Sequence, residues 1–472
     1  MKLTKEIEER IDRWIDAHTE DYVTDLSKLI AVPSVANRGV APGEFPFGEN
    51  SAKALAAAKT LAESYGFSVE NRDNFCLVAK VGEGKEKVGL FGHLDVVPVG
   101  TGWTYPPFTL TREGDLMIGR GVMDDKGPLW ASVYAVRCLK ELDLLPDRAI
   151  EIFMGGDEEC GMEDVKHYKE TSGELPVVSF TPDADFPLCH GEKGIMRFVL
   201  DIPNENSNVV AFEGGTVRNI VADHAELTLS GVSFEEAAEK VGENERVKVV
   251  SDGDFVKLVA TGRAVHASQP DNGINAIALA ANAALDAGLL NEGGKKALAF
   301  VAKTLSDCHG KAIGVPLEDE PSGKLSHVGG VIRTGDGSLA LNIDIRYPVT
   351  KNGDDVIAAI KAVVEPEGVT VSDFSDSHSI YISADSDLVK TCMDTINGVF
   401  QRDWKPYTMG GGTYARNLPN AYALGPEDPE FHPFGLFRGG VHQDDEVAPL
   451  SLFVKTMKVY ARLLLRLDEL TF

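Results

Sequence analysis

The sequence predicts an α/β fold in which a mostly parallel sheet is covered by helices and interrupted by an inserted α+β domain. Up to about residue 195 short apolar runs alternate with helical patterns, from about 196 to 384 strand patterns dominate, and after about 385 the first pattern returns. Strands that alternate with helices favour a parallel sheet. We therefore predict one domain over 1–195 and 385–472 and a second, inserted domain over 196–384.

Strands and helices alternate in the first domain. The apolar runs Lys87–Phe91 and Ala149–Met154 predict two strands, each followed by a loop with acidic side chains. A helix begins near Pro128 between them, because proline suits the first turn of a helix. The C-terminal segment predicts another helix, since its apolar residues from Leu450 to Leu464 recur at helical spacing. These elements would build the helix-covered sheet.

The inserted domain is predicted from its clearest strand, Leu339–Arg346. Leucines and isoleucines alternate with polar residues there, so that Arg346 stands on the polar face. Helical patterns cover Ser233–Lys240 and Ala276–Leu289, the second after a Gly-Ile-Asn turn. Strands and helices of this kind favour two β-α-β-type halves.

Composition argues against several classes of partner. The 472-residue chain has 46 basic and 73 acidic residues, a net charge of −27 spread along its length, which argues against nucleic acid and anionic membranes. The N-terminal segment has the pattern of an amphipathic helix without the apolar core of a signal peptide. The six cysteines lie far apart without a C-x-x-C pair, so we expect neither a disulfide framework nor a thiolate zinc site, and a reducing cytoplasm fits best.

Five loops concentrate histidines and carboxylates, and each follows, or is expected to follow, the end of a strand. They are His93–Asp95, Gly119–Gly127, Gly155–Gly161, Thr181–Asp185 and Gly440–Glu446. Any one alone is a weak signal, because an H-x-D pair is most often structural and adjacent glutamates are usually solvated. Together they supply imidazole and carboxylate ligands without a thiolate, which suits Zn²⁺, Co²⁺ or Mn²⁺. They also suit a two-metal site with a bridging carboxylate.

The order of these motifs along the chain resembles that of the M20 family of metallopeptidases. The motifs read G-H-x-D-V-V-P, G-R-G-x-x-D-x-K-G, D-E-E, P-D, R-A-V-H-A-S-Q-P and a late histidine, from about residue 90 to 446. The long insertion and the loop Met409–Arg416 look most like the bacterial dipeptidase V branch. The resemblance implies a zinc-peptidase-like catalytic domain over 1–195 and 385–472, and a lid domain of two ferredoxin-like halves over 196–384.

The resemblance assigns the first metal ligands. It implies that His93 binds one ion and that Asp95 hydrogen-bonds the other ring nitrogen, since residues two apart share a strand face. It also implies that Asp124 bridges two ions and that the peptide bond after it is cis. The adjacent Asp125 would be structural.

The glutamate pair and two later residues complete the implied centre. Glu158 would be the general base and Glu159 a metal ligand, two neighbouring side chains that point different ways at a strand-to-loop turn. Asp183 would complete the ligands of the first ion, although Asp185 competes for that place by same-face geometry. His442 would complete the second.

Substrate contacts are implied mainly in the inserted domain. His266 would stabilise the oxyanion, and the alternative is a histidine that caps its own loop. Arg346 would bind the C-terminal carboxylate of a peptide through two parallel hydrogen bonds. Asn219 and Thr413 would be further contacts with the substrate.

We therefore predict a cytoplasmic two-metal dipeptidase that hydrolyses short peptides with a free N-terminus, with Zn²⁺ ahead of Mn²⁺ or Co²⁺. Relatives with a shorter lid use dimer contacts to bring a lid histidine to the active site. The long insertion here would supply that half of the lid in the same chain, so we expect a monomer. The nearest alternative is an amidohydrolase of the same family that deacylates an N-acyl or N-succinyl amino acid, because the metal ligands would be shared. A non-catalytic metal- or peptide-binding protein on the same scaffold is the remaining alternative.

Overall fold

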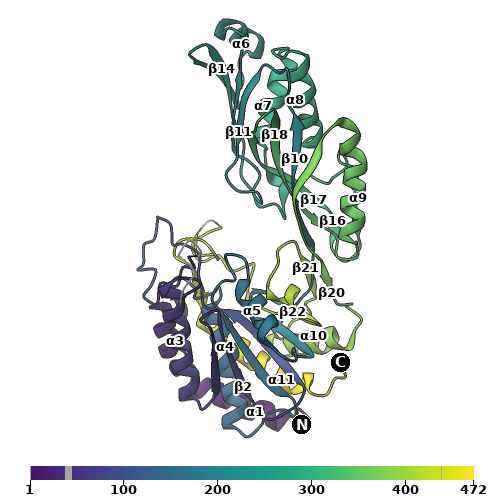
Figure 1. The fold of residues 1–472 in the computed structure, drawn as a ribbon. Helices are drawn as coiled ribbons and strands as arrows, with labels where there is room; N and C mark the ends of the chain where they lie inside the picture. The colour runs from purple at the N-terminus through teal and green to yellow at the C-terminus, as the bar shows by residue number, and fades with distance from the viewer. Residues whose placement is uncertain (1, 38–44, 437) are drawn as a thin grey trace. The chain divides into compact units, whose positions relative to one another are not determined.

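The computed structural model describes residues 2–37, 45–436 and 438–472, and the chain forms two compact units. Unit 1 comprises Met1–His190, Ile382–Tyr407 and Thr413–Phe472, and unit 2 comprises Gly191–Tyr381 and Thr408–Gly412 (Figure 1). The sequence placed the boundaries at 195/196 and 384/385. It did not anticipate that 408–412 belongs with unit 2, where the backbone N–H of Lys193 donates to the carbonyl of Met409 at 2.9 Å.

Unit 1 is built on a sheet with the order β1-β2-β6-β3-β7-β22. Its strands are β1 (Ser68–Arg72), β2 (Cys76–Val81), β3 (Lys87–His93), β6 (Ala149–Gly155), β7 (Val178–Thr181) and β22 (Ala421–Ala423). The central strands β6, β3, β7 and β22 run parallel, whereas β1 and β2 are antiparallel at one edge. The strands predicted from the two apolar runs are confirmed as β3 and β6. Their carboxyl ends meet at one edge of the sheet.

Short strands accompany the loops of this unit. A three-stranded sheet contains β4 (Thr111–Glu113), β5 (Leu116–Ile118) and β24 (Val447–Pro449), and a separate pair contains β8 (Ala184–Asp185) and β23 (Pro426–Glu427). The chain passes between the units in β9 (Cys189–Glu192), β20 (Ile380–Tyr381) and β21 (Tyr407–Met409).

Helices cover the sheet of unit 1 (Figure 1). They are α1 (Lys5–Ala17), α2 (Thr19–Ile30), α3 (Glu49–Ser64), α4 (Lys126–Glu141), α5 (Glu163–Thr171), α10 (Asp387–Phe400), α11 (Leu450–Leu467) and the 3₁₀ helix η3 (Tyr414–Asn417). Helix α4, predicted from the proline at its first turn, is buried along nearly its whole length, with Leu129, Trp130 and Leu139 fully inaccessible. It packs against α1, α2, α11 and β3, which explains why it is apolar on almost every side.

Unit 2 contains one antiparallel sheet with the order β13-β14-β12-β11-β17-β18-β10-β19. Its strands are β10 (Gly194–Pro203), β11 (Val209–Gly214), β12 (His224–Leu229), β13 (Val247–Asp252), β14 (Phe255–Thr261), β17 (Ser326–Thr334), β18 (Ser338–Tyr347) and β19 (Thr370–Ser377). Further elements are α6 (Phe234–Val241), η1 (Pro270–Asn272), α7 (Ala276–Asp286), α8 (Glu292–Thr304), β15 (Glu318–Asp319), β16 (Gly323–Lys324), α9 (Gly353–Val364) and η2 (Glu365–Glu367).

The sheet of unit 2 divides into two ferredoxin-like halves. In the half β19-β10-β18-β17, the chain order is β10, α8, β17, β18, α9, β19, the β-α-β-β-α-β arrangement, with the other half inserted after β10. The other half, β11-β12-β14-β13, has the same spatial order. Its edge strand β11 precedes the other strands in the chain instead of following them.

Among the described residues, no helix has both the length and the apolar character that crossing a bilayer would require.

Because each unit has its own hydrophobic core, we expect two separable thermal transitions. Ile152 in β6 of unit 1 and Ile343 in β18 of unit 2 are both fully buried. Truncation to alanine should destabilise the unit concerned by about 2–5 kcal/mol. In differential scanning calorimetry, Ile152→Ala should lower one transition and Ile343→Ala the other. A single transition lowered equally by both variants would refute separate cooperative units.

Candidate metal centre

The candidate site forms where three parallel strands end. His93 at the end of β3 pairs in register with Gly155 at the end of β6, and β7 runs on the other side of β3. The loops that follow these strands meet at one edge of the sheet, where α/β proteins usually bind ligands. Asp95, Glu158 and Asp183 lie on these three loops.

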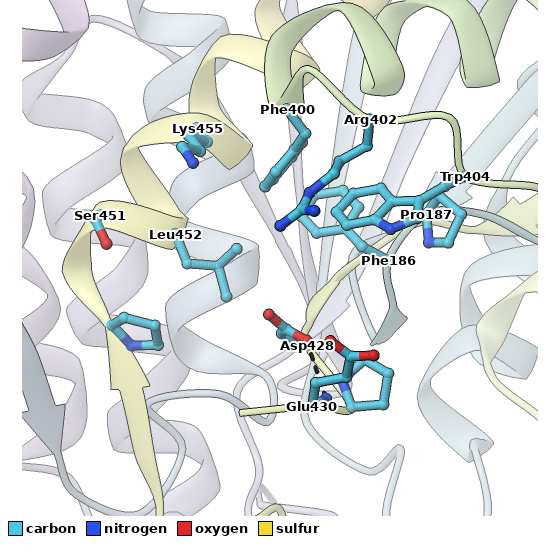
Figure 2. A pocket seen from close by; sticks show the side chains of 12 residues that line it. Phe186, Pro187, Phe400, Arg402, Trp404, Asp428, Glu430, Ser451, Leu452 and Lys455 are labelled. Carbon is cyan, nitrogen blue, oxygen red and sulfur yellow. Dashed lines mark hydrogen bonds between the residues drawn. The ribbon is translucent and has the colours of Figure 1, made fainter. Parts of the chain in front are cut away.

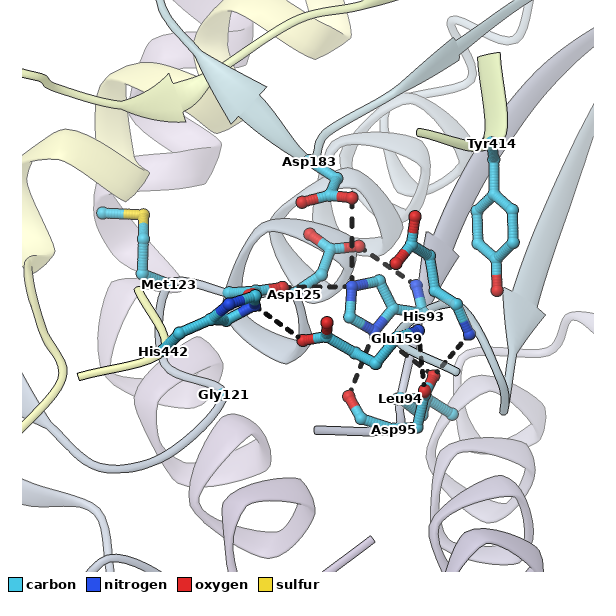
Figure 3. Close-up of polar contacts among 12 residues, drawn as sticks. His93, Leu94, Asp95, Gly121, Met123, Asp125, Glu159, Asp183, Tyr414 and His442 are labelled. Carbon is cyan, nitrogen blue, oxygen red and sulfur yellow. Dashed lines mark hydrogen bonds and ion pairs between the residues drawn. The ribbon is translucent and has the colours of Figure 1, made fainter. Parts of the chain in front are cut away.

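Asp124 lies between two histidines from distant parts of the chain. Its Oδ1 is 3.1 Å from Nε2 of His93, and its Oδ2 is 2.8 Å from Nε2 of His442. Each carboxylate oxygen thus faces one imidazole, as a carboxylate that bridges two cations would. Nε2 of His442 is also 3.1 Å from Oε1 of Glu159 (Figure 3).

Asp95 contacts both the histidine and the glutamate loop. Nδ1 of His93 is 3.0 Å from the main-chain carbonyl of Asp95 and 3.3 Å from its carboxylate. The same carboxylate accepts the backbone N–H groups of Glu158 and Glu159, each at 3.2 Å. Because a carbonyl and a carboxylate only accept hydrogen bonds, Nδ1 of His93 carries the hydrogen and Nε2 presents its lone pair toward Asp124.

Side chains that could hold a cation form two overlapping groups that share His93; they include every predicted ligand except His442, and also the predicted base Glu158. Within each group the ligand atoms lie within 4.8 Å of one another; the groups are His93 with Asp124 and Glu159, and His93 with Glu158 and Asp183. Two neighbouring groups of ligand atoms, with a carboxylate between two imidazoles, are typical of a site for more than one cation.

The structure separates the two aspartates that compete for one ligand position. Oδ2 of Asp183 is 4.0 Å from Nε2 of His93. Asp185 lies in β8 and belongs to neither group of ligand atoms, and its main-chain carbonyl accepts the hydroxyl of Tyr407 at 3.0 Å. The geometry therefore favours Asp183.

The acidic side chains repel one another when no cation lies between them. Burial, together with neighbouring carboxylates, raises the pKa of Glu158 and of Glu159 above the ordinary value and that of Asp183 to about 7. Hydrogen bonds to Asp124 and Glu159 raise the pKa of His442 to about 11. A proton on this imidazole takes the place that a divalent cation would fill.

The donor set fits divalent cations. Nε2 of His93 is buried and, among the residues that the structure describes, has no partner with hydrogen-bond geometry, although Asp124 lies close to it. Buried polar atoms without a partner are rare, and a cation between the two groups would satisfy both. Imidazole nitrogen and carboxylate oxygen without a thiolate suit Zn²⁺, Mn²⁺ or Co²⁺.

The peptide bond between Asp124 and Asp125 is cis, as the resemblance implied. The side chain of Asp125 is fully buried, and its Oδ2 accepts the backbone N–H of His93 at 3.0 Å. Asp125 therefore holds the end of β3 beside the centre through the backbone of a predicted ligand.

Glu446 fixes the loop that carries Asp124, and sequence reasoning missed it. Its fully buried carboxylate accepts from Nη1 of Arg120 at 2.7 Å. It also accepts the backbone N–H groups of Gly121 and Asp124 at 3.1 Å and of Met123 at 2.8 Å. The signal that could have found it is an acid four residues after His442, within a motif already singled out.

Asp164 supports the glutamate loop in the same way. Its Oδ2 accepts the backbone N–H groups of Gly156 at 2.8 Å and Asp157 at 2.9 Å, and the hydroxyl of Tyr414 at 2.5 Å. Sequence reasoning assigned Asp164 no role, because its partner Tyr414 lies 250 positions away in the chain.

In unit 2, His266 and Asn219 lie side by side. Nδ2 of Asn219 is 3.4 Å from Nε2 of His266, and the two loops are tied by the backbone N–H of Ala267, which donates to the carbonyl of Asn219 at 2.9 Å. The backbone N–H of Ser268 donates to Nδ1 of His266 at 3.2 Å, and Oγ of Ser268 is 2.7 Å from the same atom. Since a backbone N–H only donates, Nδ1 accepts, and a neutral ring then carries its hydrogen on Nε2, which Asn219 can bond only through its side-chain oxygen, with the amide turned over.

Two predicted substrate contacts already have partners within the chain. Arg346 is 2% exposed and donates to Asp344 through Nε at 2.7 Å and Nη2 at 3.2 Å, and through Nη1 to the carbonyl of Gly410 at 3.0 Å. The prediction placed Arg346 on the polar strand face but did not anticipate that Asp344, on the same face, holds the guanidinium. Thr413 is buried, and its Oγ1 accepts the N–H of Ala415 at the start of η3, at 3.2 Å.

A separate cavity of about 510 Å³ lies in unit 1 (Figure 2). Stacked or tilted rings of Phe186, Phe400 and Trp404 form part of its wall, and Leu452 and Lys455 of α11 form another part. None of the predicted site residues lines it.

Comparison with known proteins identifies the family. The model of Peptidase family M20/M25/M40 matches residues 89–466. The chain belongs to this family. The protein named "Putative dipeptidase YtjP" of Bacillus subtilis (strain 168) is 33% identical to this M20 protein over 467 residues, which cover 95% of this chain and 98% of the relative.

Solved structures share the fold of the M20 protein. Human carnosine dipeptidase 1 matches with a TM-score of 0.55 at 19% identity, covering 98% of this chain and 100% of its own. The aminoacylhistidine dipeptidase of Vibrio alginolyticus matches with a TM-score of 0.53 at 15% identity, covering 95% and 96%. The M20 protein is a peptidase, a hydrolase of peptide bonds.

Asp95→Asn should weaken metal binding without removing a ligand. The amide places an NH₂ group where the carboxylate accepts, so either His93 or one glutamate N–H loses its acceptor. By isothermal titration calorimetry, we expect the affinity of the M20 peptidase for Zn²⁺ or Mn²⁺ to fall about 10–100-fold. Asp185→Asn is the matched control and should bind as the unmodified chain does. Equal weakening in both variants, or in neither, would contradict the role of Asp95.

Proposed function

We propose that this M20 peptidase is a metal-dependent dipeptidase that hydrolyses short peptides with a free N-terminus. The observation that carries the proposal is Asp124 placed between His93 and His442, with Glu158 beside the group. The names of the similar proteins, carnosine dipeptidase and aminoacylhistidine dipeptidase among them, favour a two-residue substrate.

The residues proposed to hold two divalent cations, with Zn²⁺ ahead of Mn²⁺ or Co²⁺, are His93, Asp124, Glu159, Asp183 and His442. Cations bound there would polarise the scissile carbonyl and make water a stronger nucleophile near neutral pH. Asp95 would orient His93 and hold the glutamate loop through its backbone.

Glu158 is proposed as the general base. Its pKa is raised by burial and by Asp183, which favours proton uptake from the attacking water and later proton donation to the leaving amine. The adjacent Glu159 points to His442 instead, so the pair divides into a ligand and a base.

His266 is proposed to donate a hydrogen bond to the oxyanion. Because Ser268 occupies Nδ1, the neutral ring carries its hydrogen on Nε2, which is the form that a donor requires. The side chain of Asn219 contacts the same Nε2 at 3.4 Å, so the oxyanion of the substrate would have to displace it.

Arg346, Asn219 and Thr413 are proposed to contact the ends of the substrate. Asp344 and the carbonyl of Gly410 restrain the guanidinium of Arg346, so less side-chain entropy is lost when it binds a carboxylate. Because the proposed lid is part of the same chain, we propose that the enzyme acts as a monomer, and that it works in the cytoplasm.

Glu158→Gln should abolish turnover while leaving metal binding intact. The amide keeps the shape of the side chain but accepts no proton, so kcat should fall at least about 10²–10⁴-fold. Metal content measured by mass spectrometry of the native protein should stay at two ions per chain. Glu170→Gln, an exposed position in α5, is the control. Retained turnover in Glu158→Gln would exclude this base, and loss of both ions would reassign it as a ligand.

The substrate class is tested with three matched peptides. We expect a free dipeptide to be cleaved by the metal-reconstituted enzyme, and its N-acetylated form and the corresponding tripeptide to be cleaved far more slowly, as judged by mass spectrometry of the products. Cleavage of the acetylated form alone would make the protein a deacylase of the same family. Bound metal without hydrolysis of any amide would indicate a binding protein.

A further inference from the structure

A second group of metal-ligand side chains lies in unit 2 and contains none of the predicted site residues. Ligand atoms of Asp271 in η1 and of Cys308 and His309 in the loop after α8 lie within 4.8 Å of one another. Nε2 of His309 is 2.9 Å from Oδ1 of Asp271, and Sγ of Cys308 is 3.8 Å from the same oxygen. In tetrahedral zinc sites with bonds of about 2.0–2.3 Å, ligand atoms are roughly 3.3–3.8 Å apart. The group therefore needs only small shifts to hold a cation.

The loop that carries two of these side chains is held rigidly. The carboxylate of Asp307 accepts three backbone N–H groups, from His309 at 2.8 Å, Lys311 at 3.0 Å and Ala312 at 2.9 Å. The carbonyl of Cys308 accepts the backbone N–H of His327, at the start of β17, at 2.8 Å. Prearranged ligands bind a cation without the entropy loss of ordering a loop.

The ring of His309 is oriented so that its lone pair faces a carboxylate. Nδ1 of His309 is 2.8 Å from the carbonyl of Leu325, which only accepts, so Nδ1 carries the hydrogen. In the neutral ring, Nε2 then has only a lone pair to offer the carboxylate of Asp271. A cation placed between these two acceptors would bind both.

A buried histidine beside the group lacks a partner. His327 is 2% exposed, and its Nε2 has no hydrogen-bond partner among the residues that the structure describes. It lines a cavity of about 210 Å³ together with Asp271 and Cys308. Nδ1 of His327 is 3.4 Å from the carbonyl of Asp307, which only accepts, so Nδ1 carries the hydrogen and Nε2 presents a lone pair. A hydrated cation in the cavity could satisfy this nitrogen.

We propose that Asp271, Cys308 and His309 bind a divalent cation of the zinc type, with a water molecule as the fourth ligand in the cavity lined by His327. One thiolate, one imidazole and one carboxylate suit Zn²⁺ or Co²⁺ rather than Mg²⁺ or Ca²⁺. The centre in unit 1 differs from this site because it offers no thiolate.

The position of this site indicates what the cation would do. Asp271 lies in η1, directly after the loop of His266, and the backbone N–H of Gln269 donates to the carbonyl of His266 at 3.0 Å. A cation that joins η1 to the rigid loop at Cys308 would restrain the segment that carries the proposed oxyanion donor. The site would therefore act on His266 through its backbone, not through contact with substrate.

Cobalt distinguishes the two kinds of site in the full chain. A thiolate bound to Co²⁺ gives an intense charge-transfer absorption in the near ultraviolet, and a site of nitrogen and oxygen donors does not. Titration of the metal-free protein with Co²⁺ should therefore produce this band together with a third bound ion. Cys308→Ser should lose the band and the third ion but keep the two others.

Two further variants keep the test decisive. Cys160→Ser removes an exposed thiol next to Glu159 and should retain the band. Asp271→Asn changes a carboxylate whose side chain is 65% exposed, so the fold should tolerate it, and it should weaken binding of the third cobalt ion about tenfold or more. Absence of the band from the unmodified chain would overturn the proposal. A band that survives in Cys308→Ser and disappears in Cys160→Ser would overturn it as well.

Discussion

The centre in unit 1 depends on one buried carboxylate, that of Asp95. It lies against the Nδ1 side of the His93 ring and accepts the backbone N–H groups of both Glu158 and Glu159. The ends of two neighbouring parallel strands are thereby held at a fixed separation, and the proposed ligand and the proposed base keep their places relative to each other. The same arrangement, a buried carboxylate that accepts backbone N–H groups, recurs in the surrounding loops at Asp125, Glu446 and Asp164.

These hydrogen bonds from the backbone explain how the loops of an acidic protein can hold together a centre that is itself rich in carboxylates. Backbone N–H groups stabilise the charged form of the outer carboxylates, although burial still raises the pKa of Asp125, Glu446 and Asp164. Burial raises the pKa values of Glu158 and Asp183, whereas the neighbouring imidazoles of His442 and His93 outweigh burial at Asp124 and keep its pKa below the ordinary value. Structural and reactive carboxylates are thus distinguished by the groups that surround them.

The fold and the positions of the proposed inner ligands at strand ends could be predicted because their signals are local. Apolar runs that end in H-x-D or D-E-E place His93 and Glu158 at strand ends without reference to the rest of the chain. The choice between Asp183 and Asp185 could not be made from sequence, since both face the same side of an extended segment and only tertiary packing separates them.

Partners that lie far apart in the sequence could not be predicted for the same reason. Nothing near Glu446 in the sequence indicates that it accepts from a loop more than 320 positions earlier. The pairing of Arg346 with Asp344 was local and could have been noticed, but the contact with Gly410 required knowing that 408–412 joins unit 2. Cys308 is not part of a C-x-x-C pair, so the sequence contained no sign that it could bind a metal. Its possible partner ligands are the adjacent His309 and Asp271 from another loop.

The crowding of inner carboxylates has a consequence for the lifetime of the protein. A ligand that binds only the folded chain stabilises it in proportion to the logarithm of its free concentration over its dissociation constant. When divalent metal is scarce, the uncompensated charge in the interior favours opening of the strand-end loops, and the opened chain is the form that proteases degrade. The abundance of the enzyme would then follow the metal supply of its surroundings even when synthesis is constant.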